Sequence, residues 1–237
     1  MKILGIDSSG LVASVAVVED GVLLGEYTTN YKKTHSQTLL PMLDEVKKMI
    51  ELDLNTVDAI AISAGPGSFT GLRIGSATAK GLGLALNKPL VEVPTLEGLA
   101  YNLYGCEAVV CPIMDARRNQ VYTGIYEFTA ENELKSVMDQ SAMDIHDLLR
   151  ELERINKKVI FLGDGVAVYR GVIESECQVP FSFAPAHLNA QRAGSVAALG
   201  ALYFAKGRAI PAKAHQPEYL RKSQAEREKE EKAQQGT

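Results

Sequence analysis

Short apolar runs separated by glycine and polar turns dominate the first thirty residues. This pattern predicts three successive strands, and the Asp-Gly pair at 20–21 is typical of a tight hairpin turn. Apolar residues then recur every three or four positions, as in amphipathic helices, between short buried runs. The predicted order is βββαβαβα, over Lys2–Ser8, Val12–Glu19, Val22–Thr29, Ser36–Leu52, Ala59–Ser63, Thr70–Leu86, Leu90–Val93 and Thr95–Leu103.

The second half of the chain repeats this order in outline. Its predicted elements are strands over Glu107–Met114, Val121–Phe128, Leu134–Met138 and Val159–Leu162, and helices over Ile145–Arg154 and Ala193–Ala205. A doubled order of this kind is that of an α/β protein with two ribonuclease H-like lobes, as in the actin, sugar-kinase and Hsp70 (ASKHA) superfamily. We predict an N-terminal lobe over 1–104, a second, degenerate lobe over 105–218 that includes the helix at 193–205, and a charged tail over 219–237.

Composition narrows the function classes. The chain has 237 residues, 46% of them hydrophobic and 23% charged, which is typical of a packed soluble protein. Its net charge of −4 gives no overall basic excess, so we expect any RNA contact to be shared with a partner. The odd number of cysteines (Cys106, Cys111 and Cys177) favours reduced thiols in a cytoplasmic protein. We see no signal peptide and no run of the ~18 apolar residues that a membrane helix needs.

Small residues recur every four positions along the second predicted helix, at Gly71, Gly75, Ala79 and Gly83. Each glycine inside a helix costs ~1 kcal/mol relative to alanine, so another backbone is expected to approach this face closely. The spacing alone leaves two partners open, which are the chain's own sheet or first helix, and a helix of another chain. Nearby leucines that would add apolar contact are Leu39, Leu43, Leu72 and Leu82.

Two glycine-rich turns are candidates for anion binding. Asp7-Ser8-Ser9-Gly10 ends the first strand, where the superfamily brings a hairpin turn to nucleotide phosphate, although such a turn also forms by bonding its own backbone. The segment Gly65–Arg73 joins a strand to a helix, whose first N–H groups attract anions, while capping by a serine explains the same composition. The candidate contacts are Asp7, Ser8, Ser9, Ser68 and Arg73. A third segment, Gly163-Asp164-Gly165, is either an adenosine-contacting loop or a tight turn.

The stretch Lys88–Ala100 (KPLVEVPTLEGLA) resembles the KPLVGVNHLEGHA segment of the TsaD/Kae1 family of tRNA threonylcarbamoyladenosine synthases. Two histidines at this spacing hold the catalytic metal in that family. Thr95 and Leu99 occupy the equivalent positions here, and a leucine side chain cannot bind a metal. The resemblance therefore implies a retained scaffold without the metal site, and we expect no metal and no cofactor.

Three further segments resemble the TsaB family: GPGSFTGLRIG at 65–75, Met114–Arg117 and Tyr219–Glu226. This resemblance implies a cytoplasmic, non-catalytic subunit that binds a TsaD-type synthase and, through the complex, a TsaE-type ATPase and tRNA. The implied reaction is threonylcarbamoylation of the adenosine next to the anticodon (t6A) of ANN-decoding tRNAs. The family pairs with TsaD, or with itself, through the first two helices. The implied interface residues are Leu39, Leu43, Gly71, Leu72, Gly75, Ala79, Leu82 and Gly83.

Two other functions are weighed against this hypothesis. An ATP-dependent small-molecule kinase of the same fold is favoured by Asp7 and the 163–165 loop, but no convincing catalytic aspartate stands between the lobes. A metallopeptidase is disfavoured by Thr95 and Leu99, because a catalytic metal needs about three protein ligands.

Overall fold

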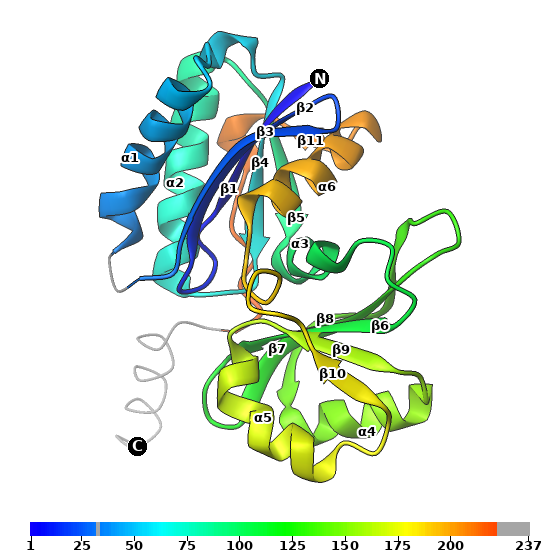
Figure 1. Cartoon of the computed structure of the whole chain (residues 1–237). Coiled ribbons are helices and arrows are strands. Elements are labelled where there is room, and N and C mark those ends of the chain that lie inside the picture. Colours follow the sequence, from blue (N-terminus) through cyan, green and yellow to red (C-terminus); the bar gives the residue numbers. More distant parts are fainter. Residues whose placement is uncertain (32–33, 222–237) are drawn as a thin grey trace, which may run out of the picture.

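The computed structural model describes residues 1–31 and 34–221, so residues 222–237 of the predicted charged tail lie outside the described residues. The chain forms two mixed β-sheets, one above the other, each flanked by helices (Figure 1). This arrangement confirms the predicted α/β architecture with two related halves. Among the described helices, none combines the length and apolar content that a membrane crossing requires.

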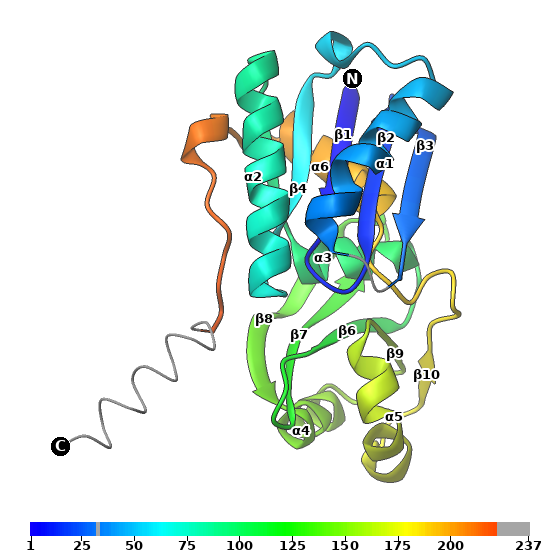
Figure 2. The same ribbon diagram turned by 90° about the vertical axis from the view of Figure 1, so that its left-hand side faces the viewer.

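The first sheet has six strands in the order β11-β5-β4-β1-β2-β3. Their bounds are β1 (Lys2–Asp7), β2 (Ala13–Glu19), β3 (Val22–Thr29), β4 (Ala59–Gly65), β5 (Leu90–Pro94) and β11 (Ala209–Ile210). β1 pairs antiparallel with β2 and parallel with β4, so it lies inside the sheet and is apolar on both faces. Helices α1 (His35–Met49) and α2 (Phe69–Leu86) cover one face, and α6 (Ala193–Ala205) covers the other (Figure 2).

The second sheet has five strands in the order β10-β9-β6-β7-β8. Their bounds are β6 (Val109–Asp115), β7 (Gln120–Phe128), β8 (Leu134–Asp144), β9 (Val159–Leu162) and β10 (Phe181–Phe183). Helices α4 (Ile145–Ile155) and α5 (Gly165–Glu176) pack on one face, and α3 (Thr95–Ala100) packs on the other. Because α3 also touches β4 and β5, it joins the two sheets.

The prediction that the helix at 193–205 belongs to the second lobe is wrong. Buried residues of α6, among them Val196 and Leu199, form a core cluster with Ile3 and Val91 of the first sheet. Two close approaches explain this position, since a Cβ at Gly5 would meet Ala197 and a Cβ at Gly200 would meet Ala61. The prediction followed the order of elements along the chain. After β10, however, the chain returns to the first sheet, and α6 completes the first lobe.

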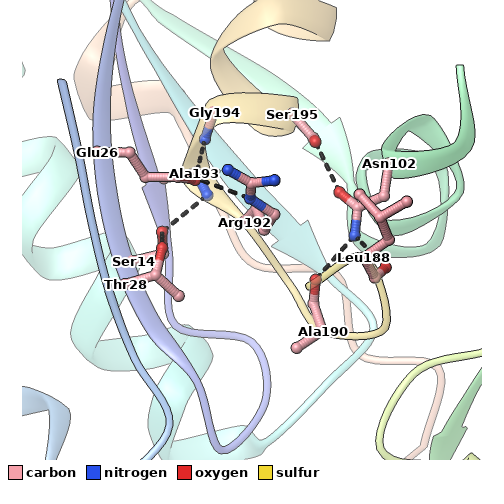
Figure 3. Close-up of polar contacts among 10 residues, drawn as sticks. All are labelled: Ser14, Glu26, Thr28, Asn102, Leu188, Ala190, Arg192, Ala193, Gly194 and Ser195. Atoms are coloured by element: carbon pink, nitrogen blue, oxygen red, sulfur yellow. Dashed lines mark hydrogen bonds and ion pairs between the residues drawn. The ribbon is translucent and has the colours of Figure 1, made fainter. Parts of the chain in front are cut away.

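Polar contacts fix the segment between β10 and α6, through which the chain returns to the first sheet (Figure 3). Glu26 on β3 forms an ion pair with Arg192 and accepts a hydrogen bond from Gly194 N at 3.0 Å, at the start of α6. A carboxylate at a helix N-terminus is favourable because unpaired N–H groups point toward it. Asn102, just after α3, donates to the carbonyl oxygens of Leu188 (2.9 Å) and Ala190 (2.8 Å). These contacts hold the crossing segment against elements of the first half.

Helix α5 and strands β10 and β11 were absent from the predicted order. Helix α5 carries Gly165, Gly171 and several β-branched residues, which are weak helix formers, so its sequence gives little signal. The predicted tight turn at 163–165 is the start of this helix. The two strands have only three and two residues, too few to show a periodic pattern.

Candidate functional site

The small-residue stripe of α2 faces the chain's own sheet. A Cβ at Gly75 would overlap Ser8 Oγ and lie 3.2 Å from Ile62 Cδ1, and a Cβ at Gly83 would lie 2.7 Å from Ala212 Cβ. Ala79 is fully buried in the same cluster. The close backbone approach predicted from the spacing is therefore internal, between α2 and the end of β1.

Seven of the eight predicted interface residues are consequently covered by the chain itself. Leu39, Leu43 and Leu72 are 2–5% exposed, the four stripe residues are buried, and Leu82 is half-buried against the same core. This corrects the predicted interface set, because an amphipathic helix turns its apolar stripe to its own sheet first. A partner that binds this helix pair must contact other residues.

The outer faces of α1 and α2 carry a different set of residues. On α1, Leu40 and Met49 are 55% and 83% exposed. On α2, Leu84 is 60% exposed, and the exposed residues Arg73, Ala77, Gly81 and Ala85 recur every four positions. A Cβ added at Gly81 would meet nothing within 4 Å. Helix α2 thus has a second row of small residues, Ala77, Gly81 and Ala85, which was not predicted from the sequence.

The Asp7-Ser8-Ser9-Gly10 turn is buried and engaged internally. Asp7 accepts hydrogen bonds from Ser9 N (2.9 Å), Ser9 Oγ (2.7 Å) and Ser63 Oγ. Ser8 Oγ donates to Gly71 O at 2.8 Å, and Ser68 N donates to Ser9 O at 2.6 Å. Burial raises the pKa of Asp7 above its ordinary value, while its three donors oppose that rise. The turn therefore covers the start of α2, and these groups bond to each other rather than face a phosphate.

The two other candidate anion contacts lie outside this buried turn. Ser68 is exposed and caps α2 by accepting a hydrogen bond from Gly71 N. Arg73 is exposed, and its guanidinium lies 4.1 Å from the centre of the Phe69 ring. The structure therefore separates the predicted set into a buried part and a surface part.

Thr95 and Leu99 lie at the junction of the two sheets, on α3. Thr95 is fully buried and its Oγ1 accepts a hydrogen bond from Gly65 N at 3.2 Å. Leu99 is 1% exposed in a core cluster with Met114 and Leu162. Both positions are thus occupied by structural side chains. The described residues contain no group of three or more His, Cys, Asp or Glu placed to hold a metal ion.

The segment after β11 brings the three sequence markers together. Glu218 N donates to Ala64 O at 2.7 Å, beside the Gly65–Gly75 marker, and the Tyr219 ring lies 4.6 Å from the Phe69 ring. Arg221 then donates to Ala116 O at 2.6 Å, within the Met114–Arg117 marker. One strap of chain therefore joins the start of α2 to the β6–β7 turn of the other sheet.

A buried polar network anchors this strap, and the sequence analysis missed it. The fully buried His215 ring contacts Ser76 Oγ through Nε2 (2.8 Å) and Glu92 Oε1 through Nδ1 (2.6 Å). The order resembles a catalytic Ser-His-acid triad. However, Ser76 lies inside α2, where backbone N–H groups bond within the helix and cannot form an oxyanion hole. The network therefore holds the strap on α2.

The β6–β7 turn is the counterpart of the Asp7–Gly10 turn in the second sheet. Arg117, Arg118 and Asn119 all have left-handed backbone conformations, with φ of 63°, 57° and 59°. Such residues store local strain unless surrounding contacts hold them. Asp115 accepts from Arg117 N at 2.8 Å, and Ile145 N donates to Asn119 O at 3.1 Å. The turn borders a cavity of about 430 Å³.

Asp164 lies behind this turn, at the end of β9. Its Oδ1 accepts a hydrogen bond from Asp115 N at 3.3 Å. Burial raises the pKa of Asp164 to about 6, with a further contribution from the Asp115 carboxylate. The central side chain of the Gly163–Gly165 segment therefore supports the β6–β7 turn.

Sheet order and site geometry define a two-lobed α/β protein in which Thr95 and Leu99 serve as structural side chains. Comparisons with known proteins then place it more closely. Residues 22–229 match the family model described as TsaD: tRNA N6-adenosine threonylcarbamoyltransferase. The tRNA threonylcarbamoyladenosine biosynthesis protein TsaB of Bacillus subtilis is 32% identical over 226 residues, 95% of this chain and 96% of the relative. The chain belongs to the TsaB family.

Two other relatives agree with this assignment. TsaB of Escherichia coli is 35% identical over 130 residues, which cover 54% of this chain and 55% of that protein. A solved structure of YeaZ from Pseudomonas aeruginosa superposes with a TM-score of 0.76 at 29% identity, and the match covers 92% of this chain and 99% of that chain.

Proposed function

We propose that this protein is a non-catalytic subunit of tRNA threonylcarbamoyladenosine (t6A) synthesis that binds and activates a TsaD-type synthase. The observation that carries the proposal is the use of Thr95 and Leu99 in the packing of the lobe junction. A protein of this family that has structural side chains at the metal positions is suited to act through a partner that retains them. A TsaE-type ATPase and the tRNA would join through that partner.

The outer faces of α1 and α2 are the partner surface in this proposal. Exposed Leu40, Met49 and Leu84 supply apolar area, and Ala77 and Gly81 allow a partner helix to approach closely. Interfaces concentrate their energy in a few well-packed central contacts, so a large side chain in the middle of this face is expected to act sharply. The same surface would serve for a homodimer of the isolated chain.

Gly81→Leu tests this surface, with Gly171→Leu on α5 as the matched control. Both positions are exposed and helical, and neither has an atom within 4 Å of a built Cβ. We expect Gly81→Leu to weaken binding to the TsaD-type synthase at least tenfold, measured by calorimetry, and Gly171→Leu to leave it unchanged. Equal affinity of both variants for the synthase would mean that the interface lies elsewhere on the chain.

A reconstituted tRNA threonylcarbamoylation assay tests the role itself. Omission of this chain is expected to remove most of the activity, while the chain alone forms no t6A. Full activity without this chain would end the proposal. Formation of t6A by this chain alone would instead make it an enzyme.

A further inference from the structure

The cavity beside the β6–β7 turn is lined by residues of that turn, of the first turn of α4 and of α5, and it holds about 430 Å³. These helices lie at the opposite end of the molecule from the α1–α2 pair (Figure 1). The side chains that matter for the chemistry of the cavity are Asp115, Arg117, Arg118, His146 and Tyr169. Neither the proposed partner surface nor the buried Asp7 turn uses any of them.

Acidic groups around the cavity are already engaged. Asp115 accepts hydrogen bonds from Arg117 N and from Tyr169 Oη (3.3 Å), and Asp144 accepts one from His146 N (2.9 Å). Glu176 contacts His146 Nδ1 at 2.7 Å. On the adjoining helices, Asp147 pairs with Arg150, and Glu174 pairs with Arg170.

The guanidinium groups of Arg117 and Arg118 differ from these paired arginines. Within 1–31 and 34–221, neither guanidinium makes a hydrogen bond or an ion pair, and both residues are exposed and line the cavity. The backbone that carries them is fixed, since Gln120 N donates to Arg117 O and Arg221 donates to Ala116 O. Two consecutive residues of a turn with a fixed backbone therefore carry unpaired cationic side chains.

We propose that Arg117 and Arg118 bind a phosphate group of an RNA backbone and so hold the tRNA substrate of the complex. Planar guanidinium groups match the oxygens of a phosphate through paired N–H donors. The exposed position and the carboxylate of Asp115 disfavour a small free anion, which needs a drier and more positive pocket. A polyanion gains instead from several phosphates and from counterion release.

This inference rests on the proposed function, because tRNA is the ligand only if the chain acts in t6A synthesis. It adds a role for the second lobe. It also agrees with the net charge of −4, since the contact is local and contributes within the complex rather than by the chain alone.

Binding of an ANN-decoding tRNA to the complex with the TsaD-type synthase tests the proposal. The variant is Arg117→Gln/Arg118→Gln, and the control is Arg150→Gln/Arg154→Gln, which removes the same charge from arginines paired with Asp147 and Glu151. We expect about a tenfold loss of affinity and a salt slope smaller by 1 to 2 for the first variant, and less than a twofold change for the control. Arg117→Lys/Arg118→Lys is expected to keep most of the salt-dependent affinity.

Three results would overturn the assignment. One is unchanged tRNA affinity in a Gln variant that keeps its circular dichroism spectrum. Another is weaker assembly with the synthase, which would make the turn a protein contact. The third is micromolar binding of inorganic phosphate or AMP to the isolated chain, lost in the Gln variant, which would mark a small-anion site. Failure of the wild-type complex to form t6A would refute the proposed function instead, so the two failures are distinguishable.

Discussion

The turns that join the first two strands of each sheet occupy the same place in the topology but have opposite environments. The Asp7–Gly10 turn is buried, and its carboxylate and hydroxyl groups bond to other groups of the chain. The Arg117–Asn119 turn is exposed and held in left-handed backbone conformations. The same position in the topology therefore serves as a structural joint against α2 in one sheet and as an exposed polar surface in the other. Variants in and near each turn are expected to separate stability from binding.

The largest expected effect is at the contact between the buried turn and α2. Gly75→Leu would force a side chain into Ser8 and Ile62, so we expect a loss of about 3 kcal/mol or more, or failure to fold. Gly81→Leu on the open face of the same helix is the control and is expected to change the free energy of unfolding by less than about 1 kcal/mol. Urea denaturation of both variants measures this. Equal stabilities would mean that α2 does not pack on the turn.

The next effect concerns the carboxylate of the buried turn. Ser63→Ala removes one of the three donors to Asp7 and leaves a buried oxygen unpaired, at an expected cost of about 2 kcal/mol. Ser136→Ala, which removes an exposed bond to Asp139, is the control and is expected to cost under about 0.5 kcal/mol. A Ser63→Ala protein as stable as the control would show that water replaces the lost donor.

We expect the free energy of unfolding to depend on pH through Asp164, which lies behind the exposed turn. Because burial raises the folded-state pKa of Asp164 to about 6, this carboxyl makes folding less favourable as pH rises from about 4 to about 6. This loss of stability is complete above pH 6, and it is absent below the ordinary pKa of an aspartate. We expect the loss of stability to be about 1 kcal/mol, since the Asp164 side chain is only half-buried.

Asp164→Asn removes this titration, so its stability relative to the wild type is expected to rise across that pH range. Unfolding free energies measured at pH 4, 5, 6 and 7 provide the comparison. A constant difference between the two proteins across these pH values would assign the pH dependence to other groups.

The smallest effect is expected at the strap that joins the start of α2 to the β6–β7 turn. Arg221→Ala removes the hydrogen bond to Ala116 O, at an expected cost of about 0.5 kcal/mol because the contact is half-buried. Hydrogen exchange at the β6–β7 turn is expected to quicken, with little change in the first sheet. Arg154→Ala on α4 is the control. Uniform changes throughout the protein would indicate that the strap stabilises the whole chain.

Much of the architecture was predictable from local pattern. The apolar runs of β1, β2 and β4, and the periodic residues of α1 and α2, were assigned to within a few residues, because strands and amphipathic helices repeat at fixed periods. Helix α5 was missed because its glycines and β-branched residues obscure the pattern. The family was also predictable, since its markers are contiguous stretches of sequence.

The sequence by itself determined the fold class, the family and the presence of threonine and leucine, rather than two histidines, at positions 95 and 99. Only the tertiary structure decided which side of α2 faces inward, because two rows of small residues lie on that helix and the sheet can cover just one of them. It also decided that α6 completes the first sheet and that Arg221 meets Ala116. These contacts join residues 100 or more positions apart, and periodicity along the chain carries no record of which distant segments pack together.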